Sequence, residues 1–171
     1  MRRFGAALAA MALLAGCGAF SKTGDLEVPS PDVAVCAPAG HDRDVLFGVL
    51  VRNMGDKAVT VRDIAVGSSA NVAASTVRLD VTGPDWLGTD FDPADSAAGQ
   101  ARVDRALARL VDPRSAEIGP GAYANIIVMM TPADATIPAV VDSVRIDYVQ
   151  GGRHHNATSR MALTLAPGET C

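Results

Sequence analysis

The chain has 171 residues, of which 20% are charged, and a formal net charge of −4. This length is enough for one domain with a sizeable hydrophobic core. A weakly acidic chain disfavours nucleic acid and anionic lipid as partners, because both carry negative charge.

The N-terminus has the pattern of a secretory signal. Arg2 and Arg3 give it a positive start, and the uncharged apolar run FGAALAAMALLAG follows. This run is shorter than the ~20 residues that a membrane-spanning helix needs. The pattern therefore predicts a cleaved signal peptide over residues 1–16.

Leu14-Ala15-Gly16-Cys17 resembles the lipobox of bacterial lipoproteins. In that family the cysteine thiol is diacylated and becomes the first mature residue, so the resemblance implies that Cys17 is a lipid attachment point. Two acyl chains anchor a protein stably where one chain is marginal. We expect a lipid-anchored protein on the extracytoplasmic side of a cell membrane, with a mature chain of 155 residues and a net charge of −6.

Cys36 and Cys171 remain once Cys17 carries lipid. An even number of cysteines in an oxidising compartment favours a disulfide. The bridge would join the start of the folded part to the last residue, and closing so long a loop contributes up to ~4–5 kcal/mol. The sequence has no CxxC and no Cys/His cluster, so the cysteines do not support a zinc site.

Residues 17–32 are polar and rich in Gly, Ser and Pro, which predicts a flexible tether before a domain over residues 33–171. From Val33 onward apolar residues alternate with the period of β-strands. A turn at NMGDK contains Gly55, which can take a positive φ. A change of phase after Val61 predicts a bulge near Arg62–Asp63. The expected strands cover 33–36, 45–53, 58–66 and 76–83.

The alternation then stops, and a helical pattern begins. Asp92-Pro93 is a typical helix start, with an N-cap aspartate and a proline at the first helical position. Apolar residues recur at helical spacing over 103–111, and Asp112-Pro113 ends the pattern. We predict one amphipathic helix over about 93–111, packed across the sandwich or at one end of it.

Strand patterns return after the helix. Residues 117–132 hold a Gly-Pro-Gly turn and a strand that is apolar on both faces, which is typical of a central, covered strand. Residues 142–150 and 153–165 alternate on either side of Gly151-Gly152, which predicts a two-residue hairpin loop. About seven short strands with turns between them predict an all-β sandwich with one inserted helix.

Two segments, VLVRNMGDKAVTVRDIAV and IGPGAYANIIVMMTP, resemble the bacterial immunoglobulin-like modules of envelope proteins. The likeness spans about residues 33–165 apart from the helix and implies an immunoglobulin-like β-sandwich. Such modules are mostly non-enzymatic, so we expect no catalysis and no cofactor. The first hypothesis is a module that binds an envelope protein or a cell-wall partner.

Trp86, Leu87 and Phe91 are candidate partner contacts, since they lie in the loop before the helix of a chain with few aromatic residues. An exposed aromatic loop would be a binding hot spot. The alternative is that these side chains cap the core beneath the helix, because exposed tryptophan is uncommon.

The second hypothesis is a metal-binding chaperone that uses His154, His155 and Met161. Imidazole and thioether ligands suit copper, particularly Cu(I). Copper chaperones of the cupredoxin-like lipoprotein type also have an N-x-G-D turn, but their paired H-x-M spacing is not present here. Adjacent strand residues point to opposite faces, which instead favours two ordinary polar residues beside a hairpin turn.

Overall fold

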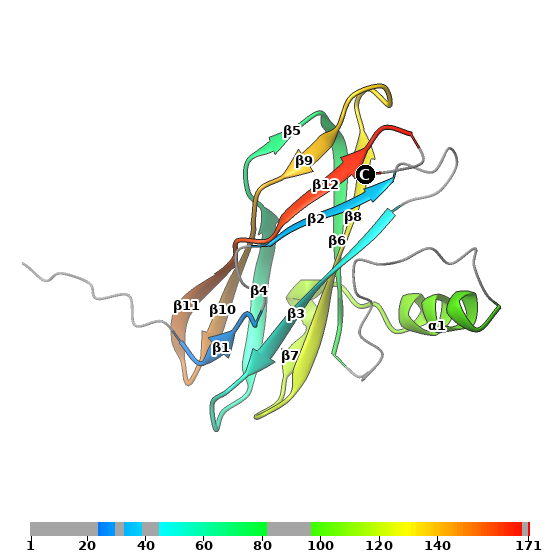
Figure 1. The fold of residues 1–171 in the computed structure, drawn as a ribbon. Helices are drawn as coiled ribbons and strands as arrows, with labels where there is room; N and C mark the ends of the chain where they lie inside the picture. The colour runs from blue at the N-terminus through cyan, green and yellow to red at the C-terminus, as the bar shows by residue number, and fades with distance from the viewer. Residues whose placement is uncertain (1–23, 30–32, 39–44, 82–96, 169–170) are drawn as a thin grey trace, which may run out of the picture.

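The structure is a computed structural model that describes residues 24–29, 33–38, 45–81, 97–168 and 171. Within these residues the chain is an immunoglobulin-like β-sandwich with one α-helix (Figure 1), as the sequence predicted. The predicted lipobox, the predicted signal peptide over 1–16 and the start of the predicted helix lie outside the described residues.

One layer of the sandwich is a four-stranded antiparallel sheet in the order β1-β3-β8-β6. Strand β8 pairs with β3 on one side and with β6 on the other, so it is the central, covered strand that its apolar faces predicted. The bounds are β1 (Leu26–Glu27), β3 (Val45–Asn53), β6 (Val72–Asp80) and β8 (Tyr123–Pro132).

The other layer consists of two sheets, in the orders β11-β10-β4-β7 and β2-β12-β9-β5. Three strands of the first sheet connect directly to three strands of the second in the same order, namely β11 to β12, β10 to β9 and β4 to β5. The two sheets are therefore parts of one layer with a break between them (Figure 1). The bounds are β2 (Ala34–Pro38), β4 (Val59–Val66), β5 (Ser69–Ala70), β7 (Glu117–Ile118), β9 (Ala139–Val141), β10 (Val144–Gln150), β11 (Arg153–Ser159) and β12 (Ala162–Ala166).

The local patterns read from the sequence are largely confirmed. The bulge lies at Arg62, because β10 pairs Asp147 with Asp63 and Tyr148 with Val61 and leaves Arg62 between them. The hairpin loop also forms, with Gly151 and Gly152 at φ values of 58° and 77°. A type I′ turn requires a positive φ at both positions. Alternate residues of β3, β4, β8 and β10 fill the core, among them Phe47, Val49, Val61, Ile126, Ile146 and Tyr148.

Several boundaries differ from the prediction, and strand β6 begins at Val72 rather than at residue 76. Residues 153–165 form β11 and β12 rather than one strand, because the chain passes from one part of the bent layer to the other at Arg160–Met161. The predicted tether of 17–32 contains β1, whose Leu26 is 6% exposed and belongs to the core. A two-residue strand is too short to show alternation, so the polar composition around it hid this contact.

Helix α1 (Ala97–Ala108) lies on the outer face of the first layer, where Ala106 packs against Ile127 of β8. The helix ends before the predicted Val111, because that residue pairs with Leu79 as an isolated β-bridge. Leu107, expected on the apolar face, is 40% exposed. The Asp112-Pro113 pair instead starts the 3₁₀ helix η2 (Pro113–Ser115), where Asp112 Oδ1 accepts a hydrogen bond from the Arg114 N–H at 2.9 Å.

A buried ion pair joins the end of the helix segment to the first layer. Asp80 at the end of β6 is 2% exposed, and its Oδ2 accepts hydrogen bonds from Arg109 Nη2 at 2.9 Å and Nε at 3.2 Å. Arg109 directly follows α1, so this pair fixes the helix against the sheet at its C-terminal end.

Gly55 does not take a positive φ, contrary to the expectation, and a lack of space explains the glycine instead. A Cβ at this position would lie 2.5 Å from Gln150 Nε2 and 2.6 Å from Asp25 Oδ2. The turn is held by buried Asn53, whose Oδ1 accepts hydrogen bonds from the Gly55 N–H at 3.0 Å and from Gln150 Nε2 at 3.2 Å.

Gly55→Ala is expected to lower the free energy of unfolding by about 2 kcal/mol, because the new methyl group must displace the Gln150 amide from its hydrogen bonds. Urea unfolding of the variant measures the change. Gly119→Ala is the matched control, since its Cβ would have its nearest neighbour at 4.0 Å. Equal stability of the two variants would contradict the close packing at Gly55.

Candidate binding groove

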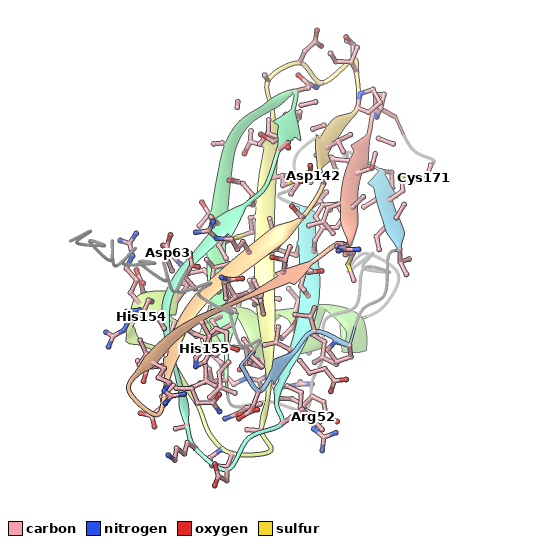
Figure 2. All side chains as sticks on the ribbon, turned by 90° about the vertical axis from the view of Figure 1, so that its left-hand side faces the viewer. Arg52, Asp63, Asp142, His154, His155 and Cys171 are labelled. Atoms are coloured by element: carbon pink, nitrogen blue, oxygen red, sulfur yellow. A yellow bond between two sulfur atoms is a disulfide. The ribbon has the colours of Figure 1, made fainter. Side chains whose placement is uncertain are left out.

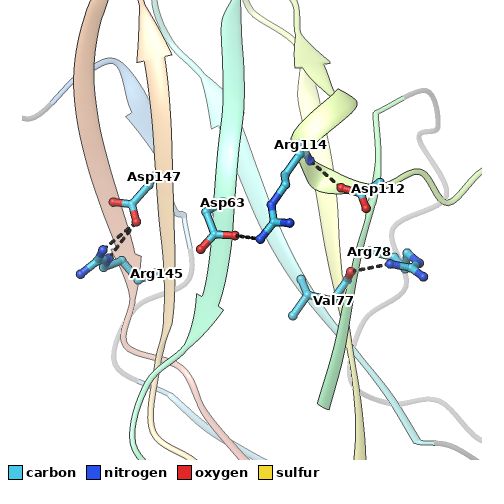
Figure 3. Close-up of polar contacts among 7 residues, drawn as sticks. All are labelled: Asp63, Val77, Arg78, Asp112, Arg114, Arg145 and Asp147. Atoms are coloured by element: carbon cyan, nitrogen blue, oxygen red, sulfur yellow. Dashed lines mark hydrogen bonds and ion pairs between the residues drawn. The ribbon is translucent and has the colours of Figure 1, made fainter. Parts of the chain in front are cut away.

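A groove of about 400 Å³ lies between β4 and β6 (Figure 3). The two strands belong to different layers, so the groove is an open side of the sandwich, with η2 at its end. Its lining combines apolar and charged side chains, namely Asp63, Ile64, Ala65, Val66, Ser75, Val77, Arg78, Asp112, Pro113 and Arg114.

One wall of the groove is the outer edge of β6, the last strand of its sheet. Leu79 exchanges two backbone hydrogen bonds with Val111, at 3.1 and 2.9 Å, so its N–H and C=O point away from β8. Hydrogen-bonding direction alternates along an antiparallel strand, so Val77 and Ser75 point their N–H and C=O groups the same way. Within the described part of the chain, no backbone group pairs with either residue on this side.

The chain leaves this edge at Asp112, and the sequence explains why. An antiparallel partner that continued from Val111 would place Pro113 opposite Val77. Proline has no N–H to donate, and the Asp112 side chain caps η2 in place of a further strand residue. The 3₁₀ turn over Pro113–Ser115 then packs against β4. These three residues therefore do not form a strand beside Val77 and Ser75.

The charged side chains in and near the groove differ in whether they form an ion pair. Arg114 binds Asp63 at 3.2 Å across the groove (Figure 3). On the neighbouring strand β10, Asp147 binds Arg145 at 2.7 Å and raises the pKa of that guanidinium. Arg78 is exposed, and the contact that the structure gives it is a hydrogen bond from its Nη1 to the Val77 carbonyl at 3.4 Å. Arg78 is therefore the groove cation without a carboxylate partner among the described residues.

Ser75→Pro is expected to leave the free energy of unfolding within about 0.5 kcal/mol of the native value, since the lost N–H points away from β8 and bonds to no backbone group of the described residues. Thr76→Pro is the matched control. Its N–H faces β8, and we expect a loss of about 2 kcal/mol. Chemical denaturation of both variants measures the difference, and equal losses would show that the two amides face the same way.

The predicted disulfide between Cys36 and Cys171 is confirmed. The two Cα atoms lie 6.0 Å apart, and the bridge joins β2 to the last residue, which Figure 2 labels.

Cys17 and the candidate contacts Trp86, Leu87 and Phe91 lie outside the described residues. In the ranges that the structure covers, no helix is both long and apolar enough to cross a membrane.

The structure does not bring the candidate copper ligands together. His154 is exposed on the outer face of β11, whereas His155 faces the other way and stacks on Tyr148 with ring centroids 5.4 Å apart (Figure 2). Burial raises the pKa of the Tyr148 hydroxyl. Met161 is a core residue that is 5% exposed. The described residues also contain no group of three or more His, Cys, Asp or Glu side chains placed to hold a metal ion.

Sequence reasoning missed the groove because its residues come from three distant segments. The position of β6 at a sheet edge depends on pairing between segments far apart in the chain, which period-two alternation does not reveal. The usable signal was Asp112-Pro113. A proline two residues after Val111 marks the point beyond which strand pairing alongside β6 cannot continue.

No protein-family model and no curated protein matches the chain. Among solved structures, the ASH / PapD-like domain of human CEP192 (PapD-like domain 7) is similar over 96% of this chain and 100% of that one, with 7% identity and a TM-score of 0.48. The Vibrio cholerae VesB protease is similar over 83% of this chain, with 11% identity and a TM-score of 0.40. The chain spans only 32% of the protease.

Proposed function

We propose that the chain is a non-catalytic, lipid-anchored lipoprotein of a bacterial envelope, and that its sandwich binds a partner protein. The observation that carries the binding proposal is the edge of β6 above the groove, whose outward N–H and C=O groups at Ser75 and Val77 have no backbone partner among the described residues. A row of outward N–H and C=O groups is complementary to another protein backbone in extended form. A protein partner therefore fits this edge better than a cell-wall polymer does.

The location rests on two independent features. The pattern of residues 1–16 followed by Cys17 resembles a lipoprotein signal. The Cys36–Cys171 disulfide suits an oxidising compartment outside the cytoplasm. The anchor places the groove near a membrane surface, where partners are other envelope proteins.

Lipid attachment is tested by expressing the full chain in bacteria with labelled palmitate. Label in the native chain and none in Cys17→Ser is the expected result. The same gel tests cleavage, since the native chain should run as a product without residues 1–16. Equal labelling of both chains, or none in either, would contradict the anchor.

Partner binding is tested with a photo-crosslinking amino acid at position 75, beside the groove, in intact cells of the native host. A second chain carries it at position 158, which is exposed on β11 in the other layer. We expect a protein adduct at position 75 that is lost when Val77→Pro removes the neighbouring outward N–H. The same adducts at both positions, or none at position 75, would contradict binding at the groove.

A further inference from the structure

We propose that the partner segment binds as an added antiparallel strand beside β6, and that one of its acidic side chains takes Arg78 away from the Val77 carbonyl. This inference rests on the proposed protein-binding function and specifies the chemistry of its ligand. The occupant is an extended segment in which an apolar residue is followed by an acidic one.

The line of the added strand is set by Val111, which already pairs with Leu79 in antiparallel register. A segment that continues this line past Asp112 lies opposite Val77, Thr76 and Ser75. Val77 and Ser75 each present one donor and one acceptor toward it. The backbone of the segment is therefore recognised without regard to its side chains.

The side chains of the added strand alternate between two surroundings. The residue opposite Val77 points into the groove between the layers, whose apolar lining includes Ile64 and Val66. The next residue, opposite Thr76, points to the outer face, where Arg78 is its diagonal neighbour. Diagonal neighbours across a strand pair are within reach of long side chains. This geometry selects an apolar residue followed by an acidic one.

Arg78 explains why the second residue must be acidic. The Val77 carbonyl accepts the Arg78 Nη1 at 3.4 Å, and an added strand needs this carbonyl for its own N–H. A carboxylate on the added strand forms stronger, shorter hydrogen bonds with the guanidinium than the carbonyl does, so an acidic residue is the preferred new partner of Arg78. Asp63, the carboxylate on the opposite wall, already binds Arg114.

The experiment selects random heptapeptides, displayed on phage, against the mature lipoprotein in detergent. We expect enrichment of peptides with an acidic residue after an apolar one. Their affinity should fall at least tenfold in Arg78→Gln and be lost in Ser75→Pro. Arg145→Gln is the matched control, since Arg145 is also exposed and charged but lies on β10. It should leave the affinity unchanged.

N-methylation of single backbone amides in a selected peptide tests the strand geometry. Binding should be lost at every second position, because alternate N–H groups face β6. Peptides that bind without this alternation, or equally well to Arg78→Gln, would overturn the added strand while leaving protein binding at position 75 intact. Failure to select any peptide overturns the inference, and failure of the crosslink as well would overturn the proposed function.

A second copy of the chain is the competing occupant of the edge. Light scattering of the mature protein over a range of concentrations distinguishes it from a partner segment. A dimer that Ser75→Pro abolishes would overturn the inference, because the β6 edge would then be taken by the chain itself. A monomer at the concentrations used for peptide selection supports it.

Discussion

Replacement of both Cys36 and Cys171 by serine is expected to lower the free energy of unfolding by about 4 kcal/mol. The two residues are 135 positions apart, so the bridge closes a loop that contains most of the domain. Cross-linking so long a loop removes conformational entropy from the unfolded chain. Both cysteines are exposed, so little apolar contact is lost with them. Most of the effect therefore comes from the unfolded state.

Urea unfolding of the oxidised native chain and of the double variant measures this difference. A reducing agent should destabilise the native chain by a similar amount and leave the double variant unchanged, which separates the bridge from the serine side chains. Since the whole stability of a domain is about 5–15 kcal/mol, the loss is a large fraction of it. A loss below about 1 kcal/mol would contradict a stabilising bridge.

Arg109→Met is expected to lower the free energy of unfolding by about 4 kcal/mol. The substitution removes the guanidinium that donates two hydrogen bonds to the carboxylate of buried Asp80. Methionine keeps much of the apolar stem of the side chain, so the loss reports on charge rather than on volume. The pair lies at the C-terminal end of the helix, where the apolar packing around Ala106 forms a cluster separate from the main core. We expect α1 to loosen along with the loss of stability.

A double-mutant cycle with Asp80→Asn checks the origin of the effect. Removal of the carboxylate charge should make Arg109→Met less costly, with a coupling free energy of at least about 2 kcal/mol. Thermal unfolding gives the four stabilities, and circular dichroism follows the helix. Additive losses in the double variant would contradict a direct ion pair. Arg145→Met, which breaks an exposed pair, is the control and should lower the free energy of unfolding far less than Arg109→Met does.

The sequence was most informative where structure is local. Alternation predicted the buried faces of β3, β4 and β10, and a change of phase located the bulge at Arg62. The paired glycines predicted the hairpin between β10 and β11 because a type I′ turn needs two positive φ values. The two cysteines left after Cys17, together with the oxidising compartment expected from the N-terminal pattern, predicted the bridge.

The sequence was least informative where the structure depends on distant segments. Leu26 belongs to the core only because β3 lies beside it, and two residues cannot display a period. The pattern around Gly55 suggested a positive φ. The glycine is needed instead because the side chains of Asp25 and Gln150 leave no space for a Cβ there. The groove depends on which strand lies at the edge of the sheet and on where Pro113 turns the chain away from that edge. The sequence contained the separate segments, but it did not show that they lie side by side.

Amide hydrogen exchange along β6 of the unliganded, mature protein tests most directly that this edge is open for a partner. The amides of Ser75 and Val77 point away from β8, and those of Thr76 and Arg78 point toward it. We predict that the first pair exchanges at least about 100-fold faster than the second. Equal protection of all four amides would contradict an open edge and with it the groove as a binding site.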